Sequence, residues 1–230
     1  MANLALTQTR MSARGAVFTA PRPAPAGVFL GFAGLVFAAL FMGGLNLVAS
    51  GQMSPLSTTM SDYVFVDGVG WLFPASLLAM CVAGVGVVIG LSARGLLRGT
   101  VGRLAMGLAM LGLVLAAAFR TDLGDTSVSM SAQIHRYAAG VVFFCVPVAV
   151  FAVARELEAR ARRSLHVSVI VTAVVLTLFL TCHLGPMPDV IGELSGLIQR
   201  LLFVAELVLL AQLVRLIQQP APQRAHALAG

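Results

Sequence analysis

Lysine is absent from this 230-residue chain, and charged residues of any kind make up only 10% of it, against 59% hydrophobic residues. A chain of this size cannot bury so much apolar surface in water, so the composition excludes a soluble globular protein and predicts several membrane spans. All 15 basic residues are arginines, and the formal net charge is +6. This arginine bias is typical of GC-rich bacterial genomes, so we expect a multi-pass protein of the bacterial inner membrane.

Cysteine is scarce as well, and the three cysteines form no disulfide framework. The sequence also lacks a phosphate-binding glycine loop, a nucleophile elbow and a nucleic-acid-binding module. The arginines are scattered over short connections between apolar runs, which favours membrane lipids and not nucleic acid as the partner. No cofactor is predicted.

Long apolar runs fill most of the chain, and about 20 apolar residues are enough to cross the hydrocarbon core. The sequence therefore predicts an all-α bundle of six transmembrane helices, at residues 27–49, 71–92, 103–119, 135–154, 166–184 and 197–217. Residues 1–25 are predicted to be a disordered cytoplasmic tail, residues 26–218 the membrane domain, and residues 219–230 a second cytoplasmic tail. A cleavable signal peptide is the alternative for the first run, but that run exceeds the usual length of 7–15 residues.

The arginines are distributed unevenly over the two sides that six spans create. The side of the N-terminus holds twelve, namely Arg10, Arg14, Arg22, Arg94, Arg98, Arg103, Arg155, Arg160, Arg162, Arg163, Arg215 and Arg224, whereas the opposite side holds Arg120, Arg136 and Arg200. Because positive charge accumulates in cytoplasmic loops, both termini are predicted to be cytoplasmic. Gly86 and Gly90, one helical turn apart in the second span, predict a close contact with another helix.

Polar side chains gather in the three connections predicted to face outward. We expect the outer loops to fold onto the bundle as one polar site, with Arg120 paired to an aspartate such as Asp62, Asp122 or Asp125. The candidate ligand-binding residues are Ser61, Asp62, Arg120, Asp122, His135, His183 and Glu206.

Three interpretations of this outer cluster remain open. Histidines and carboxylates can hold zinc with an open position for water, as a membrane-embedded hydrolase would require. His135 and His183 are also the one pair that could ligate a haem from two helices. Alternatively, the aspartates cap helices, an arginine pairs with them, and the histidines lie at the membrane interface. We predict no bound metal.

Glu206 differs from these residues because it lies near the middle of the sixth span. A carboxyl group at that depth is costly, which makes a functional role plausible. It either serves as a protonated group that hydrogen-bonds between helices or takes part in handling a proton or a substrate. Gln199 lies on the same helix face, and Asn46, Thr177 and Thr181 are candidate neighbours.

Two stretches resemble a family of bacterial and archaeal membrane proteins catalogued as domain of unknown function 998. The first is PLSTTMSDY (55–63) with GWLFPASL (70–77), and the second is FRTD (119–122) followed by Ile134 and His135. Arg120 stands where the family pattern has proline. The resemblance covers about residues 30–217 and implies a six-helix fold with a polar cluster on the outer face, without implying a reaction.

Together these features favour a non-enzymatic integral membrane protein that binds a lipid or small ligand in an outward-facing polar pocket. It would act as a sensor, a transporter-like unit or a scaffold. The alternative is a metal-dependent membrane hydrolase that uses the outer Asp/His cluster. The ligand, the oligomeric state and the physiological role do not follow from the sequence.

Overall fold

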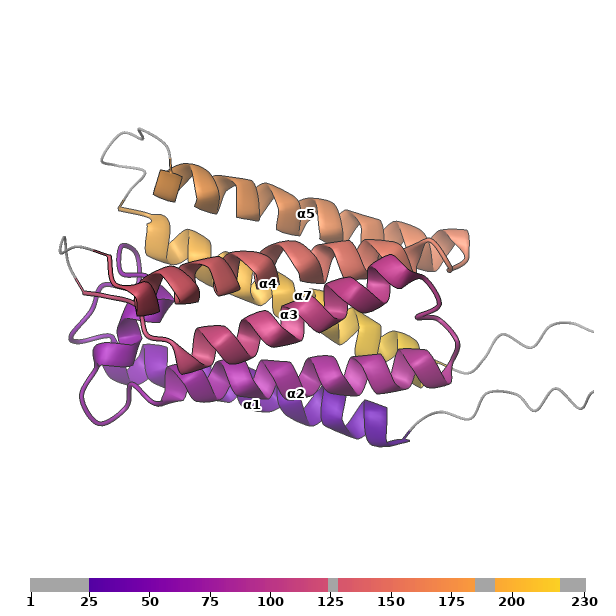
Figure 1. Cartoon of the computed structure of the whole chain (residues 1–230), viewed down its shortest axis with the longest axis horizontal. Helices are drawn as coiled ribbons and strands as arrows, with labels where there is room; N and C mark the ends of the chain where they lie inside the picture. Colours follow the sequence, from indigo (N-terminus) through magenta and orange to yellow (C-terminus); the bar gives the residue numbers. More distant parts are fainter. Residues whose placement is uncertain (1–24, 124–127, 185–192, 220–230) are drawn as a thin grey trace, which may run out of the picture.

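The computed structural model describes residues 25–123, 128–184 and 193–219, with the side chains of residues 183 and 184 outside that description. Six long α-helices and one short 3-10 helix account for most of these residues (Figure 1). In chain order they are α1 (Pro25–Ala49), η1 (Met60–Phe65), α2 (Leu72–Ala93), α3 (Thr100–Ala118), α4 (Met130–Ala154), α5 (Ala159–Leu184) and α7 (Ser195–Gln218).

All six predicted spans are confirmed as helices long and apolar enough to cross a membrane. Two of them begin well before the predicted boundary. α4 starts five residues early because Ser129 caps it, its hydroxyl accepting from the N–H of Ala132 at 3.1 Å. α5 starts seven residues early because its first turns are built from Ala and Arg, which are strong helix formers even where they are too polar to lie in lipid. The two predicted tails, apart from Pro25 and Gln219, lie outside the described residues.

The helices form one antiparallel bundle, in which α1 begins and α7 ends at the same end (Figure 1). We call this the terminal end, and the opposite end, where η1 lies, the η1 end. α7 is the central helix, because it packs against α1, α2, α4 and α5. α5 lies on the outside of the bundle, where it contacts mainly α4 and α7 and leaves most of its surface exposed.

The closest helix contact joins α1 to α2 through glycine. A Cβ atom added at Gly86 would lie 2.7 Å from the carbonyl oxygen of Gly27 and 2.9 Å from the Cα atom of Gly31. Backbone atoms cannot move aside as a flexible side chain can, so only glycine fits at this position. The predicted close approach at Gly86 is thus confirmed, and its partner is α1.

At the terminal end, Arg94 stabilises the last turn of α7. Its guanidinium donates to the carbonyl oxygens of Leu216 at 3.0 Å and Ile217 at 2.9 Å, and also to that of Gln219. These carbonyls have no partner within their own helix. A positive charge at this position also interacts favourably with the negative end of the helix dipole.

The arginine distribution predicts that the terminal end is cytoplasmic. A reporter enzyme active only outside the cytoplasm, fused after Leu123 and expressed in a bacterial host, should be active, because Leu123 lies at the η1 end. The same reporter fused after Arg98 should be silent. The reverse pattern would show that the bundle is inserted the other way round.

The α1–α2 contact leads to a second prediction, which concerns the stability of the protein. Gly86→Ala should lower the free energy of unfolding by about 1–3 kcal/mol, because the added methyl group would force two backbones apart. Gly43→Ala in α1 is the matched control, since an added Cβ there meets no atom within 4 Å. The control variant should gain helix propensity and should be at least as stable as the wild type. Thermal unfolding in lipid nanodiscs measures both, and equal stability of the two variants would contradict the prediction.

Candidate functional site

At the η1 end, the loop that contains η1 is fixed to the start of α7 by hydrogen bonds to its main-chain carbonyl groups. The N–H of Leu197 donates to the carbonyl of Leu56 at 2.9 Å, and the hydroxyl of Ser195 donates to the carbonyl of Ser57 at 3.1 Å. The N–H groups in the first turn of a helix have no partner within the helix, so a loop carbonyl supplies one. The loop is thereby held over the end of the bundle.

Arg200, about one turn further along α7, strengthens this attachment. Its Nε donates to the side-chain oxygen of Asn46 at 2.7 Å, and its NH1 donates to the carbonyls of Thr58 at 2.9 Å and Gly196 at 2.8 Å. The guanidinium carbon also lies 5.1 Å from the centre of the Tyr63 ring, a cation–π geometry. One arginine thus joins α1, the loop, η1 and α7.

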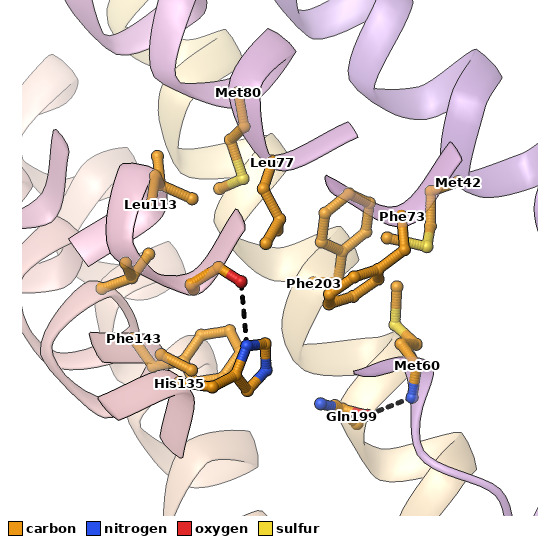
Figure 2. Close-up of a pocket in the computed structure, with 13 residues that line it drawn as sticks. Met42, Met60, Phe73, Leu77, Met80, Leu113, His135, Phe143, Gln199 and Phe203 are labelled. Atoms are coloured by element: carbon orange, nitrogen blue, oxygen red, sulfur yellow. Dashed lines mark hydrogen bonds between the residues drawn. The ribbon is translucent and has the colours of Figure 1, made fainter. Parts of the chain in front are cut away.

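Below this attachment the described residues line a cavity of about 50 Å³, which is drawn in Figure 2. A single water needs at least about 10–15 Å³, so the cavity is large enough for water or for one small organic group. Its walls come from α1, η1, α2, α3, α4 and α7. Most are apolar, namely Met42, Met60, Phe73, Leu77, Met80, Leu113, Ala116, Ala139, Val142, Phe143 and Phe203, and the two polar members are His135 and Gln199.

His135 is held by the end of α3. Its Nδ1 lies 2.9 Å from the carbonyl oxygens of both Ala116 and Phe119, and Phe73 packs against the ring at 5.9 Å between centroids. Because the last carbonyls of a helix lack partners within the helix, His135 serves as a cap donated by the neighbouring helix. The residue is 7% exposed, so His135 is a buried group at the cavity wall.

Gln199 enters the cavity from α7. Its side-chain oxygen accepts a hydrogen bond from the N–H of Met60, the first residue of η1, at 2.5 Å. This contact orients the amide and leaves its nitrogen on the side that faces His135 (Figure 2). The loop, the cavity wall and α7 are therefore connected by one hydrogen bond.

The structure divides the acidic residues of the predicted site between two local contacts. Asp62 accepts from the hydroxyl of Thr59 at 2.6 Å, and Ser61 lies 3.0 Å from the same hydroxyl. Asp122 accepts from the N–H of Ser129 at 2.7 Å and from its hydroxyl at 2.8 Å, which orders the start of α4. Both carboxylates thus act within their own segment.

Arg120 is exposed and lines a shallow hollow together with Asp67 and Trp71. Within the described residues it forms no ion pair with Asp62 or Asp122, whose oxygens accept from Thr59 and Ser129. Asp125 and the side chain of His183 lie outside the described residues, so their parts in the predicted cluster are not seen. Among the predicted site residues whose side chains the structure describes, His135 is the one that lines the cavity.

Across the described part of the chain, no three His, Cys, Asp or Glu side chains are grouped so that they could hold a metal ion. A pairing of His135 with His183 falls outside what the structure describes. The local geometry thus offers hydrogen-bonding groups at the η1 end, and we derive no metal chemistry from it.

Glu206 lies two turns deeper in α7 than Gln199 and is fully buried. Neither carboxyl oxygen has a hydrogen-bond partner within the described residues. The expected neighbours are engaged elsewhere, because Asn46 bonds to Arg200 and Thr177 is exposed and donates to its own helix at 2.8 Å. The interhelical hydrogen bond predicted for Glu206 is therefore not formed among these residues.

Sequence reasoning did not single out Met60 or Arg200, and it placed Gln199 near Glu206 and not near His135. One signal was available: Gln199 and Arg200 are adjacent polar residues inside the first two turns of an apolar span. Polar groups inside a membrane span usually face the bundle interior and pair with one another or with main-chain carbonyl groups.

The unpartnered carboxyl group predicts an unusual mutational result. Glu206→Leu should raise the free energy of unfolding by about 1–3 kcal/mol, because it removes a desolvated polar group and breaks no hydrogen bond. Glu206→Gln keeps a buried polar group and should change stability less. Thermal unfolding in nanodiscs compares the three proteins, and a Leu variant less stable than wild type would show that Glu206 has a partner such as water or a ligand.

Comparison with known proteins supports the resemblance noted in the sequence. The family described as "Protein of unknown function (DUF998)" matches residues 32–216, which include all six helices in whole or in part. No curated protein and no solved structure matches the chain. Because the match covers well over half of the sequence, this integral membrane protein with six apolar helices belongs to the DUF998 family.

Proposed function

We propose that this protein binds a small lipid-soluble molecule in the cavity beneath η1, and that it acts as a membrane sensor, transporter-like unit or scaffold. The observation that carries the proposal is the cavity itself: an apolar space with two polar side chains, His135 and Gln199, on its walls. Ligand sites in proteins typically combine a mostly apolar lining with a few placed polar groups.

The flexibility of the lining also supports ligand binding. Met42, Met60 and Met80 all reach the cavity. A methionine side chain has three rotatable bonds and a polarizable sulfur, so it adapts to ligands of different shape at low cost. The space available to a bound group can therefore exceed that of the empty cavity.

The arginine distribution supports an outward-facing site. The η1 end carries Arg120, Arg136 and Arg200, whereas the terminal end carries most of the remaining arginines. With the terminal end in the cytoplasm, the cavity lies in the outer half of the membrane. A ligand would then reach it from the outer leaflet or from outside the cell.

No observation among the described residues favours the alternative of a metal-dependent hydrolase. Asp62 and Asp122 are occupied in separate loop contacts, and neither lines the cavity beside His135. We therefore do not propose a reaction.

Filling the cavity tests the proposal. Ala116 lines the cavity and is 4% exposed, whereas Ala118, in the same helix, is exposed and does not line it. A short alkane carrying a photoreactive diazirine should label cavity residues in the wild type, because an inserted carbene reacts with whatever lines its binding site. Mass spectrometry of the digested protein measures the labelling.

Ala116→Leu should reduce labelling of the cavity residues about tenfold or more, since the larger side chain occupies the space. Ala118→Leu should leave it unchanged. Labelling spread over lipid-facing residues alone, and indifferent to Ala116→Leu, would refute the proposal.

A further inference from the structure

Two polar atoms in the cavity have no partner within the described residues: the second ring nitrogen of His135, Nε2, and the amide nitrogen of Gln199. Every hydrogen bond to these side chains is made by their other polar atoms, Nδ1 and Oε1. Figure 2 shows the two side chains facing each other across the cavity. The protein thus presents two unused hydrogen-bonding atoms to the same small space.

The contacts of His135 decide what its unused nitrogen can do. Nδ1 lies 2.9 Å from the carbonyl oxygens of Ala116 and Phe119, and a carbonyl oxygen can only accept. The proton must therefore reside on Nδ1. In the neutral ring, Nε2 then has a free lone pair and acts as an acceptor.

The contact of Gln199 decides its role in the same way. Its Oε1 accepts from the N–H of Met60, so the atom that remains is the amide nitrogen, which carries two N–H donors. The cavity therefore offers one acceptor and one donor on facing walls, surrounded by apolar side chains.

A single ligand atom that satisfies both of them must donate a hydrogen bond to Nε2 and accept one from the amide, as a hydroxyl oxygen can. We infer that the ligand proposed above presents a hydroxyl group here, so that its O–H donates to Nε2 of His135 and its oxygen accepts from the amide of Gln199. An ether could only accept, and an alkane would leave both atoms unpaired. A carboxylate would also only accept, and it would enter an apolar cavity in which no arginine lines the wall.

This inference rests on the proposed ligand site. A set of probes that includes two isomers can test the preference for a hydroxyl group separately from the existence of the site. 1-Butanol and methyl propyl ether have the same atoms and nearly the same volume, but only the alcohol has a donor. Pentane serves as the purely apolar probe and butyrate as the ionised one. Binding to the full-length protein in nanodiscs is followed by NMR of ¹³C-methyl methionine, with Met42, Met60 and Met80 assigned by Met→Leu variants.

We expect 1-butanol to shift these three methyl signals with a dissociation constant about tenfold lower than that of methyl propyl ether, as one additional hydrogen bond predicts. Butyrate should bind more weakly than 1-butanol. Equal affinities for the alcohol, the ether and pentane would overturn the hydroxyl inference but leave the ligand site standing. No shift with any probe would overturn the proposed function as well.

One variant isolates the acceptor. In His135→Asn the amide nitrogen can replace Nδ1 against the α3 carbonyls, whereas no atom reaches the position of Nε2. In this variant 1-butanol and methyl propyl ether should bind with about equal dissociation constants, and the dissociation constant of the ether should stay as in the wild type. His166→Phe is the control, because His166 stacks on Phe151 at the terminal end, and it should keep the preference.

The wild-type protein provides a further check that does not depend on the folding of any variant. The ¹⁵N shifts of the His135 ring should identify Nδ1 as the protonated nitrogen and Nε2 as the lone-pair nitrogen. A proton found on Nε2 of the neutral ring would overturn the inference, because the cavity would then offer two donors and no acceptor.

Discussion

The absence of water inside a membrane constrains this structure more than any other factor. Every main-chain N–H and C=O group in a bilayer must find a partner within the protein, and helix ends are where partners are missing. The chain has few polar residues, and it places several of them at those ends. Arg94 serves the last carbonyls of α7, and His135 those of α3. Much of the polar chemistry that resembles a site in the sequence is therefore helix capping.

The same constraint shapes the η1 end. The loop around residues 56–63 has exposed main-chain groups of its own, and α7 begins beside it with unpaired N–H groups. Leu197, Gln199 and Arg200 satisfy both sets together. Because the loop is tied down on one side of α7, its Met60 becomes part of a wall, and a cavity remains between this wall and α4. The proposed ligand site is thus a consequence of how the helix end is sealed.

Small residues decide where the helices come closest and where space remains. Gly86 lets α2 touch the backbone of α1, and α7 packs centrally against four helices. Nearer the η1 end the wall residues include Met42, Met80 and Phe203, whose long or planar side chains leave the 50 Å³ space between them. Two of the capping groups, His135 and Gln199, have one polar atom each left over at this space. These two remaining polar atoms, and not a cluster of charged side chains, allow the cavity to form hydrogen bonds with a ligand.

The sequence by itself determined the six helices, their approximate bounds and the close contact at Gly86. These features depend on local composition and period, since apolar length and small-residue spacing can be read along one segment. It also pointed to His135, but it grouped that residue with Asp62, Asp122 and Arg120 because all lie near the same ends of helices. Only the tertiary structure decided which partners these side chains take: Thr59 and Ser129 for the aspartates, the α3 carbonyls for His135, and Met60 for Gln199. The physical reason is that several partners lie within reach of each polar group along the chain, and only helix packing and loop placement bring one of them to hydrogen-bonding distance.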